Sequence, residues 1–244
     1  MKIVQIKTVY QLAFMPKLFP VNCYLIEEKD SLTLIDAALP HCAKAILQAM
    51  RKIGKPITRI VLSHAHSDHA GALDTLKQAL PDAKVYISKR DARLLDGDFS
   101  LDADEPDTPI RGGFLKTLKT RPDILLEDGD RIGSLVAIAA PGHTPGSMAF
   151  FDTRNGSLIA GDAFQTRGGL AVAGQMRPWF PFPAMATWNK EKALESARRL
   201  RACNPTLLAV GHGKMLYQPC AEIDRAIIEA ERRLARATRN LVRS

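Results

Sequence analysis

Apolar residues recur along the chain with two different periods. Short runs in which apolar residues alternate with polar ones, or follow one another without a break, predict strands. Such runs occupy residues 3–9, 22–27, 32–36, 59–63, 84–87, 124–126, 134–140, 147–152, 157–160 and 206–210. Runs with helical spacing occupy residues 41–53, 70–80, 89–95, 189–202 and about 219–241. Strands followed by helices therefore occur twice, which suggests an α/β fold of two similar halves.

Three segments keep neither period and are expected to be loops that cover the substrate. They are residues 10–21, 96–123 and 164–188. The second is acidic and contains Pro and Gly residues. The third is rich in Gly and Pro and holds both tryptophans of the chain. Long irregular segments of this kind commonly belong to binding sites.

The last predicted helix carries an apolar stripe and lies in the most basic part of the chain. The stripe, which is expected to pack on the body of the protein, consists of Ile223, Ile227, Ala230, Leu234 and Leu241. Of the net charge of +8, residues 192–244 contribute +6, from 11 basic and 5 acidic side chains. Acidic residues are interspersed among the basic ones without interleaved aromatic residues. This pattern predicts a solvated helix face, so nucleic acid is not expected as a partner.

Composition narrows the class of the protein. The chain has 244 residues, of which 46% are hydrophobic, and a single domain over residues 1–244 is expected. No run approaches the roughly 18 apolar residues of a membrane span, so no membrane partner is expected. The N-terminal residues lack the apolar block of a signal peptide, which predicts a cytoplasmic protein. Four scattered cysteines without a Cys-x-x-Cys pair predict free thiols.

Five of the six histidines lie where predicted strands end. His64, His66 and His69 follow the strand at 59–63, with Asp68 among them. Side chains alternate along a strand, so only a turn can bring these four groups to one point. Three further candidates follow other predicted strands, each beside a glycine: His143, Asp162 and His212.

The seven candidates predict a metal site. They offer imidazole and carboxylate groups without thiolate, which suits zinc and also iron, manganese or cobalt. Seven ligands exceed what one tetrahedral ion needs. The set therefore favours two divalent ions that share a carboxylate, with zinc as the expected metal.

These motifs resemble those of the metallo-β-lactamase superfamily. The resemblance rests on His-x-His-x-Asp-His at 64–69, PGHTPGS at 141–147, AGDAF at 160–164 and GHG at 211–213. It begins at the strand that ends in Asp36 and covers nearly the whole chain. It implies a four-layer αββα sandwich in which the sheets of the two halves face each other.

The resemblance also implies a role for each candidate. The first ion would be held by His64, His66 and His143. The second ion would be held by Asp68, His69 and His212. Asp162 would bridge the two ions. Asp36 would either orient a ligand or the adjacent backbone, or serve as a turn residue at the end of its strand.

Two ions of this kind would deliver a shared hydroxide as a nucleophile near neutral pH. One ion would polarise the carbonyl or phosphoryl oxygen of the substrate, and the other would stabilise the leaving oxygen. Asp68 is predicted to shuttle the proton, because it belongs to the second site and lies near the attacking water. Asp162 is the other residue assigned to catalysis.

Two apolar stretches favour a small-molecule substrate with an apolar part. Their large side chains are Phe164, Met176, Trp179, Phe180, Phe182, Met185 and Trp188 in one stretch, and Met15, Leu18 and Phe19 in the other. If they wall a pocket rather than cover the core, they suit an acyl chain or an aromatic ester better than a polyanion.

Ester or lactone hydrolysis is the predicted reaction. Quorum-quenching lactonases are similar to this chain in length, in the full ligand set and in the short segment after His212. Those lactonases commonly place a tyrosine three residues past the bridging aspartate, where this chain has Gln165, and Tyr217 is a candidate substitute. The alternatives are a phosphodiesterase or nuclease, a thioesterase, and a mononuclear iron enzyme of the persulfide dioxygenase type. A homodimer formed through the last helix stays open.

Overall fold

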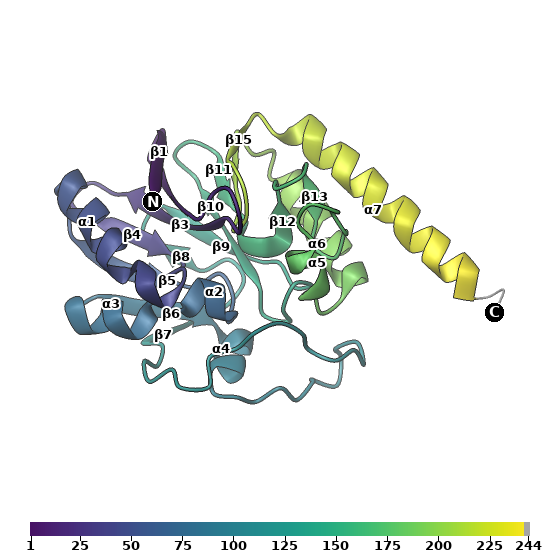
Figure 1. The fold of residues 1–244 in the computed structure, drawn as a ribbon, viewed down its shortest axis with the longest axis horizontal. Coiled ribbons are helices and arrows are strands. Elements are labelled where there is room, and N and C mark those ends of the chain that lie inside the picture. The colour runs from purple at the N-terminus through teal and green to yellow at the C-terminus, as the bar shows by residue number, and fades with distance from the viewer. Residues whose placement is uncertain (242–244) are drawn as a thin grey trace.

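Two β-sheets lie face to face, with helices on their outer sides (Figure 1). The computed structural model describes residues 1–241. The first sheet contains, in spatial order, β1 (Lys2–Ile6), β2 (Val9–Phe14), β3 (Val21–Glu27), β4 (Leu32–Ile35), β5 (Ile57–Val61), β6 (Lys84–Ser88) and β7 (Ile124–Leu126). The second contains, in spatial order, β15 (Leu216–Tyr217), β14 (Leu207–Ala209), β11 (Ser157–Ile159), β10 (Met148–Asp152), β9 (Leu135–Ala139) and β8 (Arg131–Ile132).

Helices form the two outer layers. Those of the first half are α1 (Ala43–Ile53), α2 (Ser67–Ala70), α3 (Leu73–Ala79) and α4 (Lys89–Leu95). Those of the second half are α5 (Phe182–Met185), α6 (Lys190–Ala202) and α7 (Cys220–Leu241). The four layers confirm the predicted αββα sandwich. Among the described residues, no helix is both long and apolar enough to cross a membrane.

Three apolar clusters hold the layers together. The cluster between the sheets includes Tyr24 of β3 and Phe150 of β10, both fully buried. On the outer side of the first sheet, Ile46 of α1 belongs to a second cluster. On the outer side of the second sheet, Leu200 of α6 and Ile223 of α7 belong to a third. Burial of these large side chains is the main favourable term for the fold.

The predicted stripe of the last helix packs on the body along most of its length. Ile223, Ile227 and Ala230 are buried in the third cluster, and Leu234 packs against it. The side chain of Leu241 lies outside the described residues. Figure 1 shows α7 running from the body outward to the C-terminus.

Three predicted segments need correction. The strand predicted at 3–9 is two strands, because Lys7 has a positive φ of 54° and turns the chain. The loop predicted at 10–21 is therefore wrong in its first part, since residues 10–14 pair with β3. The segment 164–188 is not wholly irregular, because it holds the hairpin of β12 (Phe164–Gln165) with β13 (Ala171–Val172), and also α5.

The remaining differences are smaller, and among them the two-residue strands β8 and β15 were not predicted. The helix predicted at 70–80 breaks between Ala70 and Leu73 into α2 and α3. The acidic segment 96–123 has no helix or strand, as predicted, apart from one isolated bridge between Phe114 and His66.

Candidate metal centre

The seven predicted ligands lie together at the ends of four strands. Beyond β5 the chain passes His64 and His66 and then turns into the single-turn helix α2, which holds Asp68 and His69. The remaining three follow the carboxyl ends of β9, β11 and β14: His143, Asp162 and His212. Potential ligand atoms lie within 4.8 Å of one another in three groups: His64, His66 and His143; His64, His69 and Asp162; Asp68, His69 and His212.

The first predicted triad presents three ring nitrogens to one point. His66 Nδ1 lies 3.1 Å from His64 Nε2 and 3.0 Å from His143 Nε2. Three nitrogens that bind one tetrahedral zinc ion at about 2.0–2.1 Å would be separated by roughly 3.3 Å. The observed separations are close to that value, so the triad fits a small divalent cation.

In two rings of this triad, the nitrogen that faces away from the site donates a hydrogen bond. His66 Nε2 donates to the Arg111 carbonyl at 2.8 Å. His143 Nδ1 donates to Thr187 Oγ1 at 3.2 Å, since that hydroxyl gives its own proton to the Pro183 carbonyl. These bonds fix the tautomer of each ring and leave the inward nitrogens as lone pairs, which cannot hydrogen-bond to one another. A bound cation would accept these lone pairs and so remove the repulsion between them.

The third ring is fixed through a longer relay. His64 Nδ1 lies 3.0 Å from Ser63 Oγ, and that hydroxyl donates to Asp36 Oδ2 at 2.8 Å. Asp36 also accepts from His69 Nδ1 at 2.8 Å. Its backbone is in the left-handed region, with φ of 63°, at the end of β4. One buried carboxylate therefore orients a histidine of each triad, which favours the orienting role over a mere turn residue.

The second triad surrounds the carboxylates. His212 Nε2 lies 3.1 Å from Asp162 Oδ2 and 3.4 Å from Asp68 Oδ2. His69 Nε2 lies 3.4 Å from Asp162 Oδ1. Asp162 Oδ2 is also 3.3 Å from His143 Nε2 of the first triad. Asp162 thus stands between the two triads, where a bridging ligand is required.

Two buried polar atoms at this point, His69 Nε2 and Asp162 Oδ1, form no hydrogen bond among the described residues, although they lie 3.4 Å from each other. Buried polar atoms are normally satisfied, because leaving one unpaired costs about 1–3 kcal/mol. The donor set, its convergence and these two atoms all fit divalent ions.

The protonation states of the two triads differ. Burial lowers the pKa of His64, His66 and His143, the last to about 3, so these rings are neutral at physiological pH. Burial also acts on His69, but the carboxylates of Asp162, Asp36 and Asp68 outweigh it and raise the pKa of that ring to about 10.

The other histidine of the second triad shifts in the same direction. Burial opposes its charge, yet Asp162 and then Asp68 raise the pKa of His212. In turn, these histidines hold the pKa of Asp162 well below its usual range in spite of burial. Without metal, His69 therefore keeps a proton at physiological pH, whereas the rings of the first triad are neutral.

Close approach of the backbone explains two glycines. A Cβ on Gly211 would collide with Asp162 Oδ1, and a Cβ on Gly112 would collide with His66 Nε2. Gly112 also has a φ of 108°, which L side chains rarely adopt. The sequence indicated the first glycine, beside His212, but gave no sign of the second.

A pocket of about 460 Å³ opens over the metal centre. Each of the predicted loop segments contributes to it: 10–21 through Phe19, 96–123 through Gly112 and Gly113, and 164–188 through Phe182, Pro183, Met185 and Ala186. Asp68 and Asp162 lie on its floor with three histidines, and Leu39 and Ser67 complete the lining.

Other apolar residues of the predicted stretches lie elsewhere. Phe164 is buried in the third apolar cluster, and Trp188 is buried with its indole nitrogen donating to the Thr108 carbonyl. Trp179 is 86% exposed and is not part of the pocket wall. Tyr217 is exposed beside Lys7 and does not line the pocket. It therefore does not replace the tyrosine that the similar lactonases commonly have at the position of Gln165.

A further buried carboxylate ties together the two loops of the first triad. Asp91 Oδ2 accepts from the Ala65 amide at 2.9 Å and from Thr144 Oγ1 at 2.8 Å. Its Oδ1 accepts from the Gly146 amide at 2.8 Å. Burial raises the pKa of Asp91 to about 6. The sequence gave no sign of this role, because Asp91 lies on α4, far along the chain from either loop.

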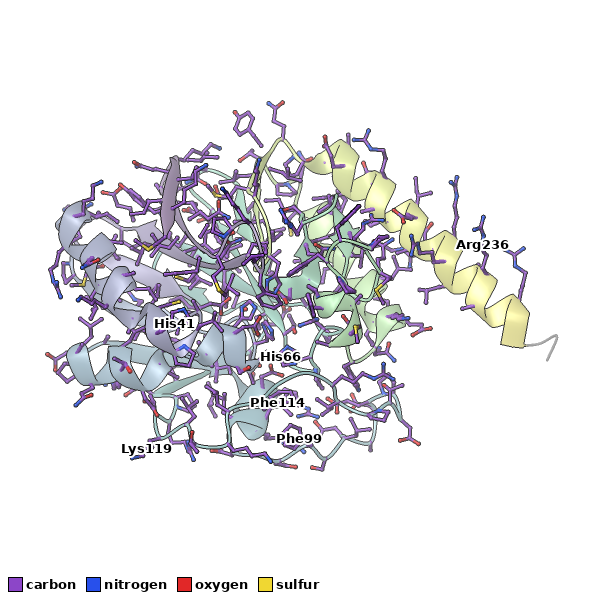
Figure 2. All side chains as sticks on the ribbon, in the orientation of Figure 1. His41, His66, Phe99, Phe114, Lys119 and Arg236 are labelled. Atoms are coloured by element: carbon purple, nitrogen blue, oxygen red, sulfur yellow. The ribbon has the colours of Figure 1, made fainter. Side chains whose placement is uncertain are left out.

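The segment 108–114 forms a strap across the site. The Ser67 amide donates to the Gly113 carbonyl at 2.8 Å, and the Phe114 ring packs edge-on against His66 at 4.9 Å between centroids. Phe99 packs in turn on Phe114 at 4.9 Å. Figure 2 shows these rings beside His66, whereas His41, the sixth histidine, lies apart from them.

Comparison with known proteins points to one family. The model of the metallo-β-lactamase superfamily matches residues 16–212. YobT of Bacillus subtilis (strain 168), an uncharacterized protein, is 60% identical over 95% of this chain and all of its own length. YflN of the same organism, a probable metallo-hydrolase, is 31% identical over 79% of this chain and 80% of its own.

A solved structure agrees as well. The crystal structure of TTHA1623 in a di-iron-bound form is 27% identical, with a TM-score of 0.60 over 86% of this chain and 95% of that one. The family match extends over most of the chain, and its last residue is His212, the last of the seven candidates. The chain therefore belongs to the metallo-β-lactamase superfamily.

Proposed function

We propose that the chain is a dinuclear metal-dependent hydrolase that cleaves an ester or lactone bond of a substrate with an apolar acyl or aromatic part. The two triads described above would hold one ion each, with Asp162 as the bridge. Zinc is the metal that we propose, and the di-iron form of TTHA1623 makes iron the alternative to test. The bound ions would activate water and polarise the substrate carbonyl.

The side chains around the ions do the rest of the chemistry in this proposal. Asp68 is the least buried of the seven, with 22% of its side chain exposed, and it lies on the pocket floor. A carboxylate in that position takes the proton of the attacking water and passes it to the leaving oxygen. The far-side hydrogen bonds of the histidines keep their lone pairs inward throughout.

The composition of the pocket wall carries the choice of substrate. No lysine or arginine is among its lining residues, and Phe19, Leu39, Phe182 and Met185 supply apolar surface. Substrates with several anionic groups away from the reacting bond need further cationic partners, which this wall does not offer. Binding of a neutral ester with an apolar part is favoured, because its apolar surface leaves water when it enters the pocket.

A panel of substrates tests the proposal. We expect the metal-loaded enzyme to hydrolyse lactones and p-nitrophenyl esters, with kcat/KM rising as the acyl chain lengthens. Phe182→Ala should reduce that gain by about tenfold, mainly through KM, because the wall loses one of its two phenylalanine rings. Trp179→Ala, outside the wall, is the matched control with a soluble ester. Faster turnover of phosphodiesters than of esters would refute the assignment.

Metal analysis distinguishes the dinuclear hydrolase from a mononuclear iron oxygenase. The dinuclear proposal requires two ions per chain in the active preparation. One iron ion per chain, with oxygen uptake on a persulfide substrate, would instead support the mononuclear oxygenase.

A further inference from the structure

Large apolar side chains gather on the surface around the mouth of the pocket. Of the thirteen large hydrophobic residues exposed among the described residues, six lie in the two short segments 15–19 and 176–185. Met176 lines a separate hollow against α7, and we call the other five the apolar collar: Met15, Leu18, Trp179, Phe182 and Met185. Such clustering marks a surface that binds something, because scattered exposed residues would need no explanation.

The collar is continuous across the two segments. The Phe19 ring lies 5.2 Å from both Phe180 and Phe182, centroid to centroid. The Arg167 guanidinium donates to the Lys17 carbonyl at 2.6 Å, which joins the neighbouring loop to the first segment. One patch therefore surrounds one side of the pocket entrance.

The substrate pocket accounts for only part of this patch. Phe182 and Met185 line the pocket, but Leu18 and Trp179 do not, and these two are 85% and 86% exposed. Their side chains face outward. Trp is the residue that prefers the boundary between water and lipid, where its ring is amphipathic.

The two collar segments carry charges of one sign, whereas the acidic segment 96–123 borders the pocket elsewhere. Residues 10–21 and 163–190 contain no Asp or Glu, and they carry Lys17, Arg167, Arg177 and Lys190. Arg177 pairs with Glu229 of α7. The other three form no ion pair with a carboxylate of the described residues. Two copies of this surface would repel each other, whereas an anionic surface would complement it.

We propose that the apolar collar docks on the surface of an anionic lipid bilayer, with Leu18 and Trp179 inserted among the lipids and the cations at the headgroups. The pocket would then open toward the membrane, so an apolar substrate would enter from it. The sequence predicts no membrane partner because it has no spanning segment, but peripheral docking requires none.

Vesicle binding tests the proposal without any substrate, so its outcome is independent of the hydrolysis reaction. The full-length, metal-loaded chain is sedimented with vesicles of phosphatidylcholine alone and with vesicles that also contain phosphatidylglycerol. We expect binding to the second kind only, weakened by salt, with a blue shift of tryptophan emission that Trp179→Phe removes. Leu18→Ser/Trp179→Ser should weaken binding by at least about tenfold.

The matched control is Leu125→Ser/Ile228→Ser, which changes two exposed apolar residues outside the collar. It should bind as the parent does, and unchanged melting temperatures would show that both double variants fold. Three results would overturn the proposal. They are no binding to either vesicle, equal binding by Leu18→Ser/Trp179→Ser, or a lipid-free dimer that the same two substitutions dissociate.

Discussion

The two triads of the metal centre prepare for a cation in opposite ways. The first consists of imidazoles that are neutral at physiological pH, since burial lowers the pKa of each ring. The second lies among carboxylates, which outweigh burial, raise the pKa of His69 to about 10 and also raise the pKa of His212. The first is preorganised by fixed tautomers, whereas the second must exchange protons for metal. The same residue type thus meets two electrostatic environments only a few ångströms apart.

The largest expected effect comes from a substitution that weakens both triads and so removes the difference between them. Asp162 contacts His143 of the first triad and both histidines of the second. Asp162→Ala should therefore weaken both sites and reduce kcat/KM by at least about a thousandfold. Metal content by mass spectrometry and ester turnover measure it. His41→Ala is the control, because His41 lies outside both triads. A variant that keeps two ions and full turnover would contradict the assignment.

Gly112→Ala should damage the first triad alone. A Cβ there would collide with His66 Nε2 and displace the Arg111 carbonyl that accepts from that nitrogen. Loss of such an outer hydrogen bond typically lowers metal affinity by about 10–100-fold. Titration against a chromophoric chelator resolves the two ions.

The neighbouring glycine supplies the control. A Cβ on Gly113 would meet only Ser67 Oγ, at 3.2 Å, so Gly113→Ala should have a small effect. If Gly112→Ala weakened both ions equally, the damage would be general and the strap would have no particular role toward His66.

The pH dependence of metal binding should differ between the triads. A raised pKa means that a histidine keeps its proton until the pH rises through that value, and a cation must displace this proton to bind. Below the raised pKa, which is about 10 for His69, second-site affinity should therefore fall by about tenfold per pH unit for each proton displaced.

The first site should change little over the same range. The pKa of His143 is lowered to about 3, so near neutral pH no proton competes with the metal there. Calorimetry in two buffers of different ionisation enthalpy counts the protons released. Release with the second ion and none with the first is the expected result; equal release by both would remove the distinction between the triads.

The seven candidate residues could be predicted from the sequence, and their support only in part. Each follows a strand and lies in a short motif, so local pattern and spacing were sufficient for His66 or Asp162. Asp36 was expected either to orient a ligand or to serve as a turn residue. Other acceptors of the rings are the backbone carbonyls of Arg111 and Pro20, on irregular loops. Any residue type can supply a carbonyl, so composition carries no trace of that role.

The fold shows the same division. The periods of the apolar positions predicted most strands and helices, because burial on one face sets those periods. The turn at Lys7 was missed, since it has no Gly or Pro of the kind that usually marks a turn. The break between α2 and α3 holds Gly71, but a single glycine within a helical pattern does not by itself predict a break. Asp91 was missed because its partners are brought to it only by tertiary packing.

Thr187 offers the smallest and most specific test of the first triad. Its hydroxyl accepts the hydrogen bond of His143 Nδ1, and it lies in the loop segment that also walls the pocket. Thr187→Val keeps the shape but leaves the ring nitrogen without an acceptor, whereas Thr187→Ser keeps the hydroxyl. We expect the first variant to lose about tenfold in first-site affinity and the second to retain it.

A cobalt-loaded sample of each variant shows whether Thr187 positions the His143 ring or only stabilises the loop. The visible spectrum of cobalt reports ligand geometry, so it should change for Thr187→Val and stay as in the parent for Thr187→Ser. If both variants melted at lower temperature with parental spectra and affinities, Thr187 would act on the stability of the loop alone. Orientation of the first triad would then depend on the Arg111 carbonyl and on Ser63, which the substitution leaves in place.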